Sequence, residues 1–203
     1  MQRFLLITTG GTIGALATPD PQRAPLFSSF PPTGTDFVQR AMPRLGFRPQ
    51  DYRRVALPPR DSKHIDAAYR ARLIQVILRS GQRRVLITHG TDALLATADT
   101  LYRTPHLRRK IILLTGAMLP LANGLASDGQ QNLAYSCMRL LARRGLPPSI
   151  YIVLSDYHGK AADWQPHLYR YRPGLLVKQY AERSDRSRLV LQRAASTRVV
   201  LPD

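Results

Sequence analysis

The chain has 203 residues, a length that predicts one domain with a substantial hydrophobic core. We find no apolar run long enough to span a membrane and no N-terminal segment organised like a signal peptide. The single cysteine, Cys137, cannot form an intrachain disulfide. These features lead us to expect a cytoplasmic protein.

The formal net charge is +17, and 26 of the 30 basic residues are arginine. A field of this sign could attract nucleic acid or another anionic surface. The arginines are scattered as pairs, mostly near the expected ends of elements, and neither a dense basic arm nor an aromatic platform accompanies them. We therefore interpret the charge as a solvated basic surface and do not expect a nucleic-acid partner.

The first expected strand, residues 3–8, leads directly into residues 9–14, which contain two adjacent glycines. Adjacent glycines allow positive φ angles and let a ligand approach the backbone closely. The turn matches neither the dinucleotide fingerprint nor a Walker loop. It presents one hydroxyl, that of Thr12, just beyond the strand. The alternative interpretation is a tight turn with a local threonine hydrogen bond.

The next segment, residues 17–35, is rich in Pro, Ser and Gly and forms a long connection. Asp36 is expected to cap a short helix that ends at residue 45. A second strand follows at residues 52–57 and ends in a polar turn around Asp61 and Ser62. A helix with one apolar stripe comes next, and its stripe consists of Tyr69, Leu73 and Ile77.

The third strand, residues 84–87, ends in a turn where the hydroxyl of Thr91 stands beside the carboxylate of Asp92. Ligands bind at the carboxyl ends of strands in open α/β sheets, which is where this turn lies. One interpretation is that Thr91 or Asp92 caps the following helix. The other is that both belong to a functional site at the positive end of the helix dipole. His89 is expected to be a packed or hydrogen-bonded turn residue rather than a base.

Two further strands are expected at residues 110–114 and 150–154. Between them lies a helix with a buried face, and Asp128 with Gln131 resembles a capping box at its start. Residues 164–203 are basic and weakly patterned, with candidate short strands at 189–191 and 199–201. Five strands alternating with helices predict an α/β fold, a three-layer sandwich with a mainly parallel, Rossmann- or flavodoxin-like sheet.

Four of these segments resemble the bacterial-type L-asparaginase family. Residues 8–13 and 88–92 look like its two signature motifs, and Asp61 with Ser62 matches its substrate-contacting turn. Residues 115–118, with 127–129 and Asn132, are similar to a third block. Their order and spacing agree with the family over roughly residues 3–160. The resemblance implies hydrolysis of the side-chain amide of L-asparagine without a cofactor or metal, and the histidines show no metal-ligand spacing.

The resemblance also implies roles for the matching residues. Thr12 is expected to be the nucleophile that forms an acyl-enzyme, and a hydroxyl needs a neighbouring base for this. Thr91 and Asp92, with a lysine, form a second catalytic group. Lys160 is the nearest lysine, with His167 as a stand-in. The turns at residues 11–12 and 90–91 are expected to supply backbone donors to the oxyanion. The expected substrate-binding positions are Gly11, Asp61, Ser62, Lys63, Gly90 and Ala117.

The family comparison further predicts the organisation of the chain. Residues 1–165 are expected to form the N-terminal-type α/β domain, and residues 166–203 a basic C-terminal extension packed on it. Two-domain members of the family carry a second domain that lends an acidic residue to the site of a neighbouring subunit. This chain resembles a short, single-domain member without that second domain. We expect it to form a homodimer or homotetramer. Residues 17–35 also lack the loop tyrosine of the longer members. The alternative function is a non-catalytic or tRNA-associated asparaginase-like module.

Overall fold

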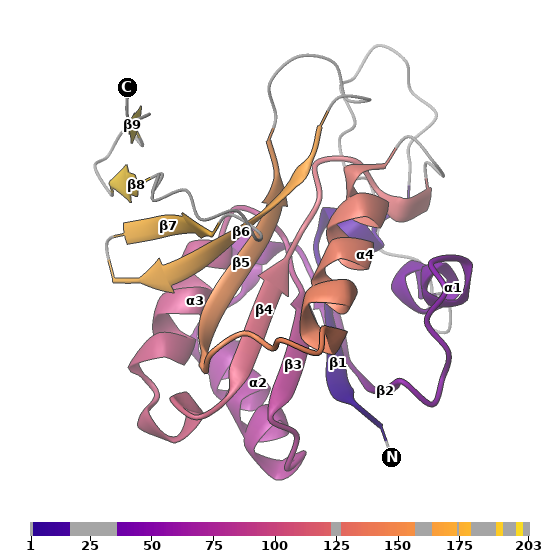
Figure 1. Cartoon of the computed structure of the whole chain (residues 1–203), viewed down its shortest axis with the longest axis horizontal. Coiled ribbons are helices and arrows are strands. Elements are labelled where there is room, and N and C mark those ends of the chain that lie inside the picture. Colours follow the sequence, from indigo (N-terminus) through magenta and orange to yellow (C-terminus); the bar gives the residue numbers. More distant parts are fainter. Residues whose placement is uncertain are drawn as a thin grey trace.

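The computed structural model describes residues 2–16, 36–122, 127–156, 164–173, 175–179, 190–192 and 198–200. Its centre is a nine-stranded sheet with the order β2-β1-β3-β4-β5-β6-β7-β8-β9 (Figure 1). The strands are β1 Phe4–Gly10, β2 Tyr52–Arg60, β3 Arg84–Thr88, β4 Ile111–Thr115, β5 Ser149–Ser155, β6 Pro166–Arg172, β7 Leu175–Gln179, β8 Val190–Gln192 and β9 Arg198–Val200. Strands β1 to β5 are parallel, and each later strand pairs antiparallel with the one before it.

Helices cover both faces of the parallel strands. They are α1 Phe37–Arg44, α2 Ala67–Arg79, α3 Leu94–Arg103 and α4 Asp128–Leu141, with the short 3₁₀ turns η1 Thr12–Gly14, η2 Ser62–His64 and η3 Pro105–Leu107. Helices α1 and α4 pack on one face, and α2 and α3 pack on the other (Figure 1). This confirms the predicted three-layer α/β sandwich, and its 2-1-3-4-5 strand order is that of flavodoxin-like sheets. Among the described residues, no helix combines the length and apolar character needed to cross a membrane.

The core explains why the strands could be found in the sequence. In β1, Phe4 and Leu6 face α1 and α4, while Leu5 and Ile7 face α2 and α3, and all four are fully buried. A parallel strand covered by helices on both faces is apolar at successive positions rather than at alternate ones. The continuous apolar runs of β1, β3, β4 and β5 follow from this arrangement.

The start of α1 is as expected, because the Asp36 carboxylate accepts a hydrogen bond from the Gln39 amide at 3.0 Å. The start of α4 is not. Ser127 is its N-cap and accepts a hydrogen bond from the Gly129 amide, so the capping box of Asp128 and Gln131 was wrong. Asp128 instead reaches back to the preceding loop, where it accepts hydrogen bonds from the amides of Met118 and Leu119.

The segment after residue 164 was the least well predicted. Strand β6 is hydrogen-bonded along β5, and Leu168 and Tyr171 are buried in the two halves of the core. Its remaining positions are polar or only partly buried, so the strand carries too few apolar residues to be recognised. Strands β8 and β9 lie within one residue of the expected short strands. The predicted domain boundary at residue 165 falls just before β6 and stays a prediction.

Asp36 holds three parts of the fold together. Its carboxylate caps α1, accepts a hydrogen bond from the Thr8 hydroxyl at the end of β1, and pairs with Arg54 of β2. Asp36→Ala should lower the free energy of unfolding by about 2–3 kcal/mol, because the cap is lost and Arg54 loses its carboxylate. Denaturant unfolding measures this. Asp66→Ala, which removes the more exposed cap of α2, is the matched control and should have a smaller effect. Equal losses would contradict the assignment.

Candidate functional site

Three turns meet at the carboxyl ends of β1, β2 and β3. A Cβ atom placed on Gly11 would lie 2.3 Å from the amide nitrogen of Gly90, and one placed on Gly90 would lie 2.6 Å from the hydroxyl oxygen of Ser62. Backbone therefore packs directly on backbone between Gly11 and Gly90. Gly11 also has a φ angle of +71°, which L side chains rarely adopt. The structure thus brings together three of the segments singled out from the sequence.

The segment after β4 closes the group. A Cβ atom on Gly116 would lie 2.8 Å from the carbonyl oxygen of His89 and 3.2 Å from the side chain of Thr91. One on Gly129, in the first turn of α4, would lie 3.0 Å from Ala117 and 3.1 Å from the side chain of Ile13. The third block consequently touches both the turn that carries Thr91 and the turn that carries Thr12.

Thr12 begins the 3₁₀ turn η1, which is closed by hydrogen bonds from Gly14 to Gly11 and from Ala15 to Thr12. Its side chain belongs to the buried polar set, with 8% of the residue exposed. The Gly11 amide donates to the carbonyl of Arg60 at 3.0 Å, which ties the turn to β2. In this geometry the hydrogen bond of the Gly11 amide is used within the fold. The sequence could not reveal this pairing.

Thr91 and Asp92 lie just before α3, whose N-cap is Ala93 with no side-chain capping bond. The interpretation of either residue as a helix cap was therefore wrong. The turn is closed by backbone instead, with the Leu94 amide donating to the Thr91 carbonyl at 3.3 Å. Thr91 is half-buried and Asp92 is exposed, so the carboxylate lies at the surface beside the first turn of α3.

His89 is a fully buried turn residue, as predicted. Its Nδ1 lies 2.7 Å from the Gly90 carbonyl oxygen, and its Nε2 lies 3.0 Å from the Thr97 hydroxyl. Burial lowers the pKa of the imidazole, which favours the neutral ring. A neutral ring with its proton on Nδ1 donates to Gly90 and accepts from Thr97, so both nitrogens are satisfied. His89 fixes the turn.

Two buried polar residues, Asn132 and Tyr69, support the turns of the site through hydrogen bonds that the sequence analysis did not predict. The Asn132 side chain donates to the Gly116 carbonyl at 3.0 Å and accepts from the Ser155 hydroxyl at 2.9 Å. The Tyr69 hydroxyl donates to the carbonyls of Pro58 and Thr9, and burial raises its pKa to about 12. The only sequence signal for Tyr69 was a hydroxyl on an otherwise apolar helix stripe.

The remaining predicted residues are placed as follows. Asp61 accepts a hydrogen bond from the Lys63 amide at 3.0 Å and so caps η2, while Ser62 is buried and Lys63 is exposed. His167 lies on β6 with its Nε2 3.6 Å from a carboxylate oxygen of Asp156. Lys160 and the connection at residues 17–35 lie outside the described residues. The described ranges contain no cluster of His, Cys, Asp or Glu side chains that could hold a metal ion.

This arrangement can support acyl transfer at a hydroxyl. Two threonines and a carboxylate lie on turns that contact one another through Gly11, Gly90 and Gly116. The turns are anchored to parallel strands, so the groups they carry are held by a rigid scaffold. Attack by a threonine hydroxyl also requires a general base that accepts its proton.

Comparison with known proteins gives a family and a fold. Residues 3–165 match the family model described as Asparaginase, N-terminal. A protein described as a probable cytoplasmic L-asparaginase from Campylobacter jejuni is similar in structure, with a TM-score of 0.59, 20% identity, and coverage of 90% of this chain and 59% of that one.

Two other solved structures are similar to the same degree. The thermostable L-asparaginase from Thermococcus kodakarensis has a TM-score of 0.57 at 21% identity and is matched over 92% of this chain and 58% of its own. L-asparaginase I from Vibrio cholerae has a TM-score of 0.57 at 20% identity, over 98% and 56%. At these identities the likeness shows the fold, and the chain spans less than two thirds of each neighbour's length.

The contact between Gly11 and Gly90 can be tested against a glycine that also has a positive φ angle but has open surroundings. Gly46 has a φ angle of +85° and no atom within 4 Å of an added Cβ. Gly46→Ala should cost about 1 kcal/mol of unfolding free energy, from backbone strain alone. Gly11→Ala should cost about 3 kcal/mol or more, because the added methyl overlaps the backbone of Gly90. Denaturant unfolding of both variants measures the difference, and equal costs would contradict the close contact.

Proposed function

The chain belongs to the asparaginase family through its N-terminal-type domain, and we propose that it is an amidohydrolase that converts L-asparagine to aspartate and ammonia. The observation that supports this most is the meeting of the four motif segments at one edge of the sheet. Gly11 packs on Gly90, Gly90 on Ser62, and Gly116 on Thr91. Residues that are up to 105 positions apart in the sequence, from Gly11 to Gly116, are thereby gathered at the carboxyl ends of the parallel strands, where α/β folds bind ligands.

In the proposed reaction the hydroxyl oxygen of Thr12 attacks the side-chain amide carbon of asparagine. The carbon–nitrogen bond breaks, and the proton taken from the hydroxyl is delivered to the departing nitrogen, which leaves as ammonia. The resulting ester of Thr12 is then hydrolysed by water, which returns the hydroxyl and releases aspartate. A base must accept the Thr12 proton, because an unassisted hydroxyl is a weak nucleophile. We assign this role to Lys160, acting with Thr91 and Asp92.

Substrate recognition follows from the charges at the edge of the site. The exposed carboxylate of Asp92 is suited to the ammonium group of asparagine, and Lys63, next to Ser62, is suited to its α-carboxylate. Gly11, Asp61, Gly90 and Ala117 complete the proposed binding positions. Because the Gly11 amide is bonded to Arg60, the oxyanion donors are assigned to the amides that follow it, in the turns of Thr12 and Thr91.

The proposed activity is modest. Residues 17–35 contain no tyrosine, so the proton-transfer partner of the longer family members is missing from that connection. Loss of a positioned acid or base typically lowers the rate by about 10²–10⁴-fold. We expect measurable asparaginase activity with a high KM and little activity on glutamine. We also propose a cytoplasmic location and residues 166–203 as an extension packed on the catalytic domain.

The role of Thr12 can be tested directly. Thr12→Ala should abolish ammonia release from asparagine, because the nucleophile is removed, while the circular dichroism spectrum stays unchanged. Thr100→Ala, which removes a threonine hydroxyl bonded within α3, is the matched control and should keep full activity. Near wild-type turnover in Thr12→Ala would rule out the assignment. Absence of ammonia release by the wild-type chain, together with salt-dependent binding of tRNA, would instead favour the tRNA-associated module.

The base can be identified from the pH dependence of kcat. A lysine accepts a proton only in its neutral form, so activity should rise from pH 7 towards pH 9 if Lys160 is the base. Lys160→Ala should lower the rate by about 10²-fold or more and flatten this rise. Lys178→Ala, which also removes one lysine from the C-terminal part of the chain, is the control. If Lys160→Ala keeps the alkaline rise, Lys160 is not the base, and His167 is the next candidate to test.

A homodimer or homotetramer is proposed, because two-domain members complete their sites with a residue from a neighbouring subunit. Light scattering at micromolar concentration should therefore give a mass of two or four times 22.8 kDa. A fully active monomer would contradict this assembly.

A further inference from the structure

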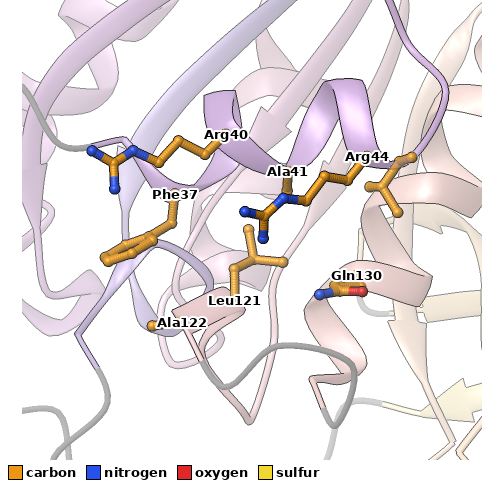
Figure 2. A pocket seen from close by; sticks show the side chains of 8 residues that line it. Phe37, Arg40, Ala41, Arg44, Leu121, Ala122 and Gln130 are labelled. Carbon is orange, nitrogen blue, oxygen red and sulfur yellow. The ribbon is translucent and has the colours of Figure 1, made fainter.

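A pocket of about 380 Å³ lies between α1 and the chain segment that leads into α4. Four residues of α1 line one wall at the spacing of a single helix face, together with the C-cap residue Leu45: Phe37, Arg40, Ala41 and Arg44. Leu121 and Ala122 form the facing wall, and Gln130 of α4 closes one end (Figure 2). None of the residues assigned to the asparaginase site lines this pocket, so it is a separate cavity.

The described residues give the lining of the pocket a positive charge. Arg40 and Arg44 are four residues apart, so their side chains lie on the same side of α1, and both are exposed. Among the described residues that line it, none is acidic. Within the described part of the chain, no ion pair joins either guanidinium to a carboxylate. The neighbouring carboxylate, that of Asp36, is already paired with Arg54 and caps α1.

The rest of the lining is mostly apolar. Figure 2 shows the ring of Phe37 and the side chain of Leu121 beneath the two arginines. Phe37 is half-buried and Leu121 is buried, so both surfaces are fixed by the core against which they pack. A ligand that enters here would therefore meet two cationic groups on one side and a firm hydrocarbon surface on the other.

We propose that this pocket binds a small organic dianion that has an apolar body, either a phosphate monoester or a dicarboxylate. Guanidinium groups bind carboxylate and phosphate oxygens through paired hydrogen bonds, and two of them one helical turn apart match two negative charges. The volume falls within the range of small-molecule sites. The apolar wall distinguishes this ligand from a free inorganic ion, for which Phe37 and Leu121 would offer nothing.

Calorimetric titration of the full chain tests the proposal with four probes. Phenyl phosphate and phthalate carry a ring with either a phosphate or two carboxylates, and at least one should bind with a Kd on the order of 0.1 mM. Which of the two binds more tightly identifies the headgroup. Inorganic phosphate lacks the ring and benzyl alcohol lacks the charge, so both should bind at least about tenfold more weakly. Binding by either control as tight as that of the better anion would overturn the proposal.

Variants locate the site. Arg40→Gln combined with Arg44→Gln should weaken binding of the better anion by about 100-fold, since each charge-assisted contact contributes about tenfold or more. Ala122→Glu places a carboxylate on the facing wall and should also abolish binding. Arg48→Gln removes an exposed arginine just beyond α1 that does not line the pocket, and it should leave the Kd within about twofold. All four positions are exposed, so the variants should fold, which circular dichroism checks.

The opposite results are equally clear. Binding that survives the double arginine variant, or that falls as much in Arg48→Gln, would assign the anion to the general basic surface. Failure of both ring anions to bind, with salt-dependent binding of tRNA lost in the double variant, would assign the arginines to a nucleic-acid surface instead. None of these measurements uses ammonia release, so they stand or fall independently of the proposed asparaginase activity.

Discussion

The whole arrangement at the carboxyl edge of the sheet depends on the direct contact between the backbones of Gly11 and Gly90. A Cβ added to Gly11 would lie 2.3 Å from the Gly90 nitrogen, whereas an ordinary van der Waals contact needs about 3.4 Å or more, so a side chain at Gly11 would force the two turns apart. Thr12 and Thr91 are the residues immediately after these glycines. The separation of Thr12 and Thr91 is therefore set by the close approach of these two backbones. The candidate chemistry depends on this separation.

Neutral hydrogen bonds hold the two turns in this contact from behind. Tyr69 hydrogen-bonds to the carbonyl of Thr9 in the first turn, and His89 hydrogen-bonds to the carbonyl of Gly90 in the second. Asn132 hydrogen-bonds to the carbonyl of Gly116 in the third block. All three side chains are buried, and burial shifts the pKa values of Tyr69 and His89 in the direction that favours their neutral forms. The charged groups of Asp92 and Lys63 lie at the exposed edge, where water can solvate them before a substrate arrives.

The elements that could be predicted from the sequence are those whose cause is local. The apolar runs of β1, β3, β4 and β5, the Asp36 cap and the stripe of Tyr69, Leu73 and Ile77 all follow from neighbouring residues, and the family motifs marked the turns. The missed features depend on distant partners. The Asp128 carboxylate accepts hydrogen bonds from the amides of Met118 and Leu119 instead of forming a capping box. The Gly11 amide donates a hydrogen bond to the carbonyl of Arg60. Strand β6 is stabilised by pairing with β5, which its own sequence does not reveal.

The excess of arginine has several separate consequences. Arg54 forms an ion pair with Asp36, and the guanidinium carbon of Arg60 lies 5.1 Å from the centre of the Tyr69 ring. Some of the arginines therefore stabilise the fold. Arg40 and Arg44 are left to line a pocket. For the proposed substrate the overall field matters little, because asparagine at neutral pH is a zwitterion with no net charge. A net charge of +17 would instead favour species with negative charge, which include the aspartate produced and the dianions proposed for the pocket. The long-range field of the basic surface therefore favours anionic ligands over asparagine, and recognition of asparagine itself must come from the short-range contacts at the turns.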